Sequence, residues 1–325
     1  MKSLNKNIIV LRAVAILLVM LGHSIILYDP GWGIYTTAVK APYFVWLKDV
    51  INSVQMPLFF SISGYLFYYS IHKSQSFASF LKNKAWRLLI PYVCIALFYM
   101  DPIKLALDVP GYSMEHLPQL IMEQATFRNN GHLWFLPCLF FIFVLMFFAL
   151  RKVHSKRGLL CFLVLLGGVS IASGKLALLY SVPVVQPVLQ YAVYFYIGFI
   201  GNMFKLPENN KVYLFLATLV FVITIAQPFH GLRPIGVLCC LYLLYQIMIN
   251  AQIPVWVDNI SKNSYGLYLF HSPLIYVTYT YLRNTPPYLV LFINFVLMVA
   301  VAYLLTLFVK STKLRFIIGE RSNRH

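Results

Sequence analysis

Charged side chains are scarce in this chain of 325 residues, and acidic ones are the scarcest. Only 11% of the residues are charged, with 9 Asp and Glu against 26 Lys and Arg, while 60% are hydrophobic. Soluble domains carry about 25% charged and about 45–50% apolar residues, so this composition excludes an ordinary soluble protein. The mean hydropathy of +0.75 indicates a chain whose solvent is the lipid bilayer.

Cysteine is sparse as well, and its spacing points to no metal or disulfide chemistry. The five cysteines lie in or beside apolar runs, and none forms a CxxC pair. Metal sites and disulfide frameworks usually show such spacing, so we expect neither and expect no metal cofactor. A small-x-small cleavage site is also lacking after the first apolar run, which we therefore interpret as a retained helix rather than a signal peptide.

What the chain has in abundance is long apolar segments. Ten windows of about 20 residues have the length and composition of a membrane span. They lie near residues 8–28, 50–71, 86–101, 133–150, 159–174, 187–203, 212–227, 234–250, 264–282 and 287–309. The sequence therefore predicts an all-α integral membrane protein with about ten transmembrane helices, forming a single polytopic domain over residues 1–325.

The distribution of cations predicts the orientation of these spans. If the N-terminus is cytoplasmic and every span crosses, one of the 26 cations, Arg12, lies within a span and eighteen fall on the cytoplasmic side. The other seven fall outside, at Lys40, Lys48, Lys104, Arg128, Lys175, Arg233 and Arg283, and the long outer loop also carries Asp101, Asp108, Glu115 and Glu123. Cytoplasmic loops collect Lys and Arg, so both termini are predicted to be cytoplasmic. This asymmetry accounts for the +17 net charge without a nucleic-acid partner.

Arg12 and His23 stand out because both interrupt the first apolar run. An ionisable group inside a membrane is costly and is a functional candidate by default. Eleven residues correspond to about three helical turns and ~16 Å of rise, so the two side chains share one helix face at different depths. The structural alternatives are that Arg12 snorkels to the headgroups and that His23 hydrogen-bonds a neighbouring helix.

Four further segments follow the Arg12–His23 pair in order. They are the Met-Pro-Leu-Phe-Phe-Ser-Ile-Ser-Gly-Tyr-Leu stretch from Met56, the basic stretch Lys82–Pro91, the Gly-His-Leu-Trp-Phe-Leu stretch from Gly131, and the Ser-Tyr-Gly-Leu-Tyr-Leu-Phe-His stretch that ends at His271. Together, over residues 8 to about 275, they resemble the acyltransferase-3 family of membrane acyltransferases, which includes fucose 4-O-acetylase-like enzymes and O-acetyltransferases of bacterial surface polysaccharides.

The resemblance implies acetyl transfer from cytosolic acetyl-CoA to a glycan hydroxyl, with the Arg and His of the first helix both important. These two positions correspond to Arg12 and His23 here. Larger members carry a fused extracytoplasmic esterase-like domain and often a glutamate near the fourth span. This chain shows neither, since His132-Leu133-Trp134-Phe135-Leu136-Pro137 holds no carboxylate, and we expect the short, stand-alone branch.

Geometry suggests a division of labour between the two residues. The planar guanidinium of Arg12 suits a phosphate of CoA, and a pantetheine arm could carry the thioester from there to His23. Burial favours the neutral imidazole, which can act as a general base; an acetyl-His intermediate is the covalent alternative.

The remaining candidate residues have both functional and structural interpretations. Lys84 and Arg87 are either CoA phosphate ligands or positive-inside anchors. Asn130, His132 and Trp134 offer hydrogen-bonding groups beside an aromatic plate, a mixture suited to a sugar ring, or simply a helix entry with a belt tryptophan. His271 lies mid-span, and it either lines the reaction cavity or bonds another helix, with Pro273 kinking the helix.

We therefore expect an O-acetyltransferase of the bacterial plasma membrane whose donor is acetyl-CoA and whose acceptor is a surface polysaccharide or a lipid-linked sugar. Two alternatives remain open. One is a transporter or flippase of lipid-linked sugars, although no inverted repeat is evident. The other is the same fold with a different short donor such as succinyl-CoA. The oligomeric state is not predicted.

Overall fold

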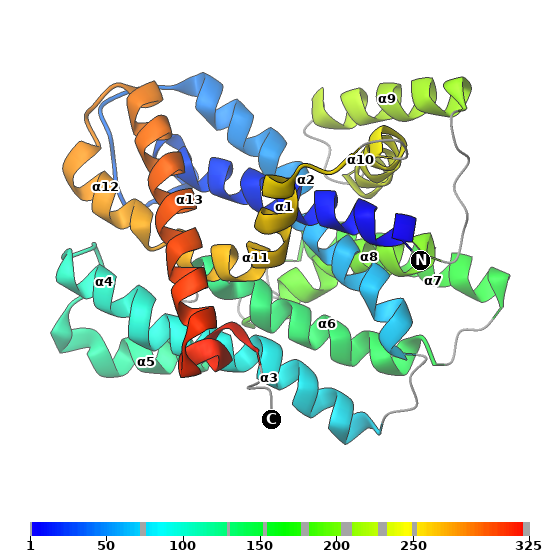
Figure 1. The fold of residues 1–325 in the computed structure, drawn as a ribbon, viewed down its shortest axis with the longest axis horizontal. Helices are drawn as coiled ribbons and strands as arrows, with labels where there is room; N and C mark the ends of the chain where they lie inside the picture. The colour runs from blue at the N-terminus through cyan, green and yellow to red at the C-terminus, as the bar shows by residue number, and fades with distance from the viewer. Residues whose placement is uncertain are drawn as a thin grey trace. The chain divides into compact units, whose positions relative to one another are not determined.

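The computed structural model describes residues 2–71, 76–128, 131–151, 155–176, 182–202, 210–226, 233–248 and 252–320. Every regular element within these ranges is helical, as predicted (Figure 1). The α-helices are α1 (Lys2–Ser24), α2 (Pro42–Ile71), α3 (Phe77–Ile95), α4 (Asp101–Ala106), α5 (Leu117–Ala125), α6 (Phe135–Ala149), α7 (Lys156–Ser173), α8 (Val185–Gly201), α9 (Lys211–Ala226), α10 (Arg233–Met248), α11 (Val255–His271), α12 (Leu274–Leu282) and α13 (Pro287–Ser311).

Within these described ranges, five helical segments are long and apolar enough to cross a membrane. They are Pro42–Ile71, Phe77–Ala106, Gly131–Ala149, Lys156–Ser173 and Pro287–Ser311, and two shorter apolar helices are Ile8–Ser24 and Lys211–Thr224. Each of the ten predicted windows overlaps at least one helix. The chain is thus an all-helical membrane protein, while the count of ten spans and the cytoplasmic termini stay predictions.

The ninth predicted window, 264–282, is broken rather than kinked. α11 ends at His271 and α12 begins at Leu274, so that Ser272 and Pro273 separate the two helices. Proline has no backbone N–H and its ring clashes with the preceding turn, which ends a helix at this point. The break leaves the last carbonyl groups of α11 in need of other partners.

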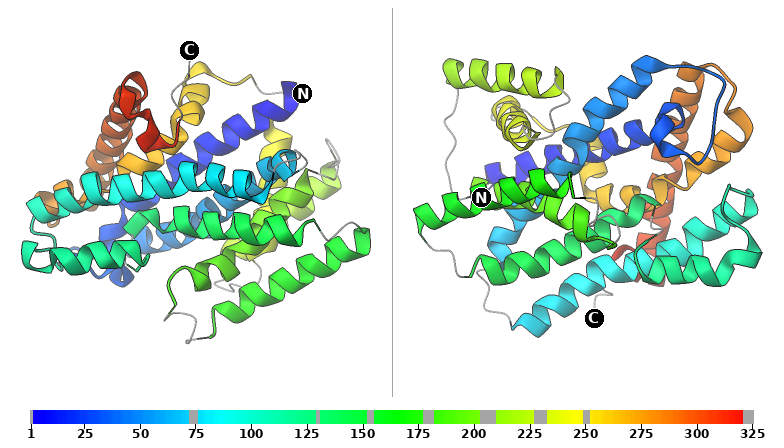
Figure 2. Two further views of the ribbon diagram at one scale, coloured as in Figure 1. Left: turned by 90° about the horizontal axis from the view of Figure 1, so that it is seen from below. Right: turned by 180° about the vertical axis from the view of Figure 1, so that it is seen from behind.

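The outer loop expected after residue 101 is mostly helical, which corrects the sequence analysis. α3 continues through a single π-helical turn (η3, Ala96–Met100) directly into α4, and α5 follows after a short 3₁₀ turn (η4, Met114–His116). α4 and α5 run side by side in Figures 1 and 2. Asp101 and Lys104, expected in a solvated loop, are buried, with 4% and 1% of their surfaces exposed.

The chain divides into two compact units. The first comprises residues 1–15, 53–81 and 138–261, and the second comprises residues 16–52, 82–137 and 262–325. The single domain over 1–325 stays a prediction.

In the first unit, α2 and α8 touch through glycine. A Cβ added at Gly64 would lie 1.8 Å from the carbonyl oxygen of Phe195, and one at Gly198 would lie 1.8 Å from that of Ser61. Gly64 therefore permits the close packing of α2 on α8, because no larger residue fits this crossing.

Candidate functional site

Three histidines from distant parts of the sequence meet within the second unit. His23 comes from the last turn of α1, His132 from the 3₁₀ turn η5 (Gly131–Trp134), and His271 from the end of α11. The ring centroids of His23 and His271 are 4.9 Å apart, and those of His132 and His271 are 5.2 Å apart. Both pairs are edge-on, with interplanar angles of 80° and 78°, so His271 is the middle ring of the cluster.

Backbone carbonyl groups fix the tautomer of each ring. Nδ1 of His23 lies 2.9 Å from the carbonyl oxygen of Val19, and Nδ1 of His271 lies 2.7 Å from that of Tyr268. A carbonyl oxygen only accepts, so each of these nitrogens carries the proton and each Nε2 is left with a lone pair. His132 has the other tautomer, because its Nε2–H donates a hydrogen bond to the carbonyl oxygen of Leu269 at 3.2 Å.

The three rings differ in how far they can be reached from outside. His271 is fully buried, His132 is 8% exposed and His23 is half-buried. The Nε2 atom of His271 is buried without a hydrogen-bond partner among the described residues. Of the three histidines, His23 has the most exposed surface and His271 has the least.

A polar cluster from α12 and α13 holds the end of α1, and so the position of His23. The hydroxyl of Tyr279 lies 3.0 Å from the carbonyl oxygen of His23 and 2.9 Å from that of Ser24. Asn294 donates its amide N–H to the Ser24 carbonyl, and its own Oδ1 accepts a hydrogen bond from Thr278. Carbonyl groups at a helix C-terminus lack intrahelical partners, and these side chains supply them.

The end of α11 is satisfied in the same way, which places His132 beside His271. The carbonyl groups of Tyr268, Leu269 and Phe270 accept from His271, His132 and Tyr99 respectively. Tyr268 in turn donates its hydroxyl to the carbonyl of His132. The helix break at Ser272–Pro273 thus creates the acceptors that organise the histidine cluster.

A buried charged pair lies next to His132. The ammonium of Lys104 donates to the hydroxyl of Tyr112 at 2.6 Å and stands 5.2 Å from the ring centroid of Tyr276. Asp101 and Lys104 act on each other electrostatically, and Asp101 accepts a hydrogen bond from Gln124. The charge of Lys104 also acts on His132.

An ion pair after the end of α1 places a cation near His23. Lys48 of α2 forms a salt bridge with Asp29, and the charge of Lys48 acts on His23. Burial alone would raise the pKa of Asp29, but hydrogen bonds from Lys48 and from the Gly31 backbone N–H outweigh it and lower that pKa below its ordinary value of 3.8. Asp29 is therefore ionised at neutral pH.

Lys84 and Arg87 lie on α3 in the same unit as the histidine cluster. Tyr265 of α11 donates its hydroxyl to the carbonyl of Arg87, and the backbone of Gly319 packs on that of Arg87. His271 follows Tyr265 by six residues on α11, a rise of ~9 Å along the helix. α11 thus links the basic stretch of α3 to the three imidazoles.

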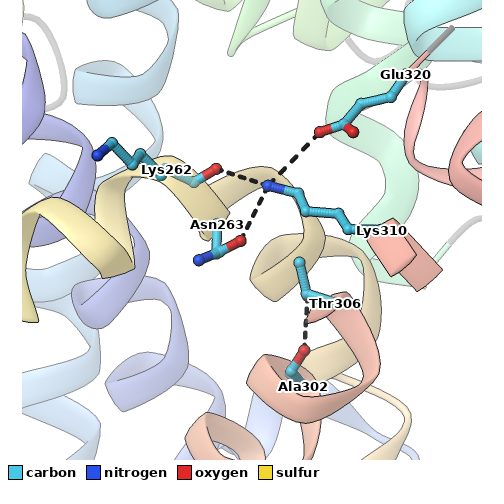
Figure 3. A network of polar contacts seen from close by, with 6 residues as sticks. All are labelled: Lys262, Asn263, Ala302, Thr306, Lys310 and Glu320. Atoms are coloured by element: carbon cyan, nitrogen blue, oxygen red, sulfur yellow. Dashed lines mark hydrogen bonds and ion pairs between the residues drawn. The ribbon is translucent and has the colours of Figure 1, made fainter. Parts of the chain in front are cut away.

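The C-terminal 3₁₀ turn η8 (Lys313–Ile318) is fixed beside this stretch. Lys310, near the end of α13, donates to the carbonyl oxygen of Lys262 at 3.1 Å and to Oδ1 of Asn263 at 2.9 Å, and forms a 3.5 Å ion pair with Glu320 (Figure 3). Lower on the same helix, Thr306 lies against Gly266 of α11, where a Cβ would meet it at 2.3 Å. Gly266 therefore permits the close packing of α11 on α13.

The structure brings some predicted site residues together and not others. His23, His132 and His271 form one cluster, and Trp134 is half-buried two residues after His132. Arg12 is half-buried on α1 but belongs to the first unit, so its shared passage with His23 stays a prediction. Asn130 lies outside the described residues.

Several residues of the site were missed by the sequence analysis. Four of them orient the cluster through backbone carbonyl groups, namely Tyr279, Asn294, Tyr268 and Tyr99. Nothing in their spacing distinguishes the three tyrosines from the other twenty in the chain, and nothing marks the asparagine. Lys104 could have been found from the sequence. It follows Asp101 by three residues at the end of an apolar run, and in a helix this spacing places both side chains on one face.

The described part of the chain holds no group of three His, Cys, Asp or Glu residues arranged to bind a metal ion. Comparison with family models matches residues 5–307 to an acyltransferase domain of the acyltransferase-3 type. The chain belongs to the acyltransferase-3 family. No curated protein and no solved structure gives a significant match.

Membership of the acyltransferase-3 family makes this chain a membrane acyltransferase, as its apolar helices and its composition independently indicate. The match covers both compact units, including all three histidines of the cluster.

Proposed function

We propose that this acyltransferase-3 protein is an O-acetyltransferase of the bacterial plasma membrane. It takes acetyl groups from cytosolic acetyl-CoA and places them on a hydroxyl of a surface polysaccharide or of its lipid-linked precursor. The observation that supports this most directly is the tautomer of His23, whose half-buried ring keeps a lone pair on Nε2 while Val19 holds the proton on Nδ1. A neutral imidazole in this state is ready to accept a proton.

The reaction needs one proton to be moved. Nε2 of His23 takes the proton of the acceptor hydroxyl as its oxygen attacks the acetyl carbonyl carbon. The carbon–sulfur bond then breaks, and the proton passes from His23 to the sulfur, which leaves as the thiol of CoA. A positioned general base of this kind contributes typically ~10²–10⁴ in rate.

In this proposal the donor enters along α3 and α11. Arg87 and Lys84 bind phosphate groups of CoA at one end of α11, and the thioester reaches the imidazoles at its other end. The exposed side chain of Arg87 is free to meet a nucleotide while its backbone is held by Tyr265 and Gly319. Arg12 supplies a further guanidinium for the donor phosphates.

The acceptor site in this proposal is centred on η5. The half-buried indole of Trp134 offers an apolar plate to a sugar ring, and the amide of Asn130 precedes it in the sequence. His132 and His271 complete the wall behind the reacting hydroxyl. Such sites combine aromatic surface with a few polar groups.

The test is acetyl transfer by the purified full-length protein in detergent, with labelled acetyl-CoA and the glycan lipids extracted from the host membrane. We expect label in the glycan fraction. A transporter would give none, because no membrane is left to cross. A parallel reaction with labelled succinyl-CoA tests whether the protein prefers another short acyl group. If it does, the proposed acetyl donor is wrong, but the proposed acyl transfer is still supported.

A further inference from the structure

Trp32 is a half-buried tryptophan in the segment that connects α1 to α2. It ends a short 3₁₀ turn, η2 (Pro30–Trp32). Its two neighbours in the sequence, Gly31 and Gly33, are exposed and have no side chain that could cover the indole. A Cβ added at Gly33 would meet nothing within 4 Å. The exposed part of the indole therefore has open space beside it.

Three tyrosine rings fix the orientation of this indole. The ring centroids of Tyr35, Tyr276 and Tyr279 lie 5.9, 6.1 and 5.6 Å from that of Trp32. The ring of Tyr276 is stacked at an interplanar angle of 29°, and the ring of Tyr279 is edge-on at 69°. Aromatic pairs attract each other at centroid distances of about 4.5–7 Å, so the indole is held by its neighbours.

The segment that carries Trp32 is itself anchored to two helices. The carboxylate of Asp29 forms an ion pair with Lys48 of α2, and the carbonyl oxygen of Asp29 accepts the backbone N–H of Trp32 at 3.1 Å. On α12, the hydroxyl of Thr280 lies 3.0 Å from the hydroxyl of Tyr35. The indole is thus presented by an ordered segment, and a preformed surface binds a ligand without the cost of ordering a loop.

Trp32 lies close to the end of α1, which carries His23. Tyr279, whose ring is edge-on to the indole, places its hydroxyl 3.0 Å from the carbonyl oxygen of His23 and 2.9 Å from that of Ser24. One tyrosine ring and one hydrogen bond therefore separate the indole from the backbone of His23. A ligand on Trp32 is a neighbour of the group that reacts at His23.

We propose that Trp32 is a second acceptor subsite, where the indole stacks on a sugar ring that is joined to the sugar receiving the acyl group. This rests on the proposed function, in which the acceptor is a glycan. A sugar ring has an apolar face of C–H groups and a rim of hydroxyls, which match an aromatic plate beside the charged side chains of Asp29 and Lys48. The segment also carries the exposed Lys40, and charged groups are costly in hydrocarbon, so it lies where a glycan is soluble.

Substitutions of Trp32 separate sugar binding from a packing role. In the detergent assay with host glycan lipids, we expect W32A to raise KM for the glycan about 10- to 100-fold, with KM for acetyl-CoA within about twofold of wild type. W32F keeps an aromatic plate and should lie between W32A and wild type. The matched control is W46A, which removes a 62% exposed tryptophan of α2 in the same compact unit and should leave both constants unchanged. A folded W32A with the wild-type KM for the glycan would overturn the proposal.

A second measurement does not depend on the variants or on activity. Full-length wild-type protein in detergent is labelled with hydroxyl radicals without acetyl-CoA, and the labelled residues are identified by mass spectrometry. We expect host glycan lipids to abolish most of the labelling of Trp32 and to leave that of Trp46 unchanged. Equal labelling of Trp32 with and without the glycan lipids would overturn the proposal even if W32A failed to fold. If wild type transfers no acyl group while Trp32 is protected, the proposed function has failed and the sugar subsite stands.

Discussion

At the scale of single residues, Lys104 and Asp101 show how much a buried charge depends on its partner. Both side chains are buried, and each is the other's electrostatic neighbour. If one of the two is neutralised, the buried charge of the other loses its electrostatic partner, which destabilises the folded protein. We expect K104M to lower the melting temperature in detergent strongly.

The matched control for K104M is R128M, because Arg128 is exposed and charged in the same region. Replacing both partners by neutral residues removes the uncompensated charge, so D101N/K104M should regain most of the stability lost by K104M. If the double variant were less stable than K104M, the two side chains would not be partners.

The lowered pKa of Asp29 makes the stability of the folded protein depend on pH. Its pKa is lowered in the folded state relative to 3.8, so its contribution to stability is fully present above that value and is lost as the pH falls toward the folded pKa. We expect D29N to melt below wild type at pH 7 and the difference to shrink as the pH falls below about 4. Melting curves of both proteins between pH 7 and 3 measure this, and a gap that widened in acid would contradict it.

The sequence predicts those residues of the candidate site whose side chains are rare in apolar segments. His23 and His271 were singled out because a histidine is rare there, and His132 because it adjoins a tryptophan at a helix start. Their clustering was not predictable, because it depends on carbonyl groups freed at the ends of α1 and α11 and on tyrosines such as Tyr279 that have no distinguishing spacing.

At the scale of elements, the crossing of α2 and α8 sets a strict limit on side-chain size. A Cβ at Gly64 would lie 1.8 Å from a backbone oxygen that cannot move aside. We expect G64A and G198A to yield little folded protein after detergent extraction, as judged by size-exclusion chromatography.

Gly168 on α7 supplies the matched control, since a Cβ there meets nothing within 4 Å. We expect G168A to be at least as stable as wild type, because alanine favours a helix over glycine by about 1 kcal/mol. Equal yields of G64A and G168A would show that the close crossing is absent from the protein in solution.

Apolar runs in the sequence predict the positions of the membrane helices. They do not predict the helices that carry polar residues, such as α4 and α5. Each predicted span overlaps a helix because burial in lipid or protein requires satisfied backbone groups. The segment after residue 101 looks like a loop because it carries charges. Instead α4 continues α3, and Asp101 and Lys104 are buried against side chains that lie after the end of α4.

At the scale of the whole molecule, the asymmetry of cations predicts which segments face the cytosol. In a variant whose own cysteines are replaced by serine, K82C should resist a membrane-impermeant maleimide in intact cells, because Lys82 precedes the third span on the cytoplasmic side. K40C should be labelled, because Lys40 is assigned to the outer side. Labelling of K82C together with protection of K40C would invert the topology.

The proposed function also requires a contact between the chain and the acyl donor. Arg12 and His23 lie on one helix but in different compact units. If Arg12 holds a phosphate of CoA, R12A should raise KM for acetyl-CoA with a smaller change in kcat. An unchanged KM for acetyl-CoA would indicate that Arg12 does not bind the donor and that its side chain instead extends to the lipid headgroups.

The central claim is that the imidazole of His23 performs the proton transfer of an acyltransferase. The most direct measurement is the rate of labelled acetyl transfer by purified H23Q, compared with H116Q, which replaces an exposed histidine outside the cluster. We expect the rate of H23Q to be about 10²- to 10⁴-fold lower at an unchanged melting temperature, and the rate of H116Q to equal that of wild type. A folded H23Q that transfers acetyl at the wild-type rate would show that His23 does not perform the proton transfer.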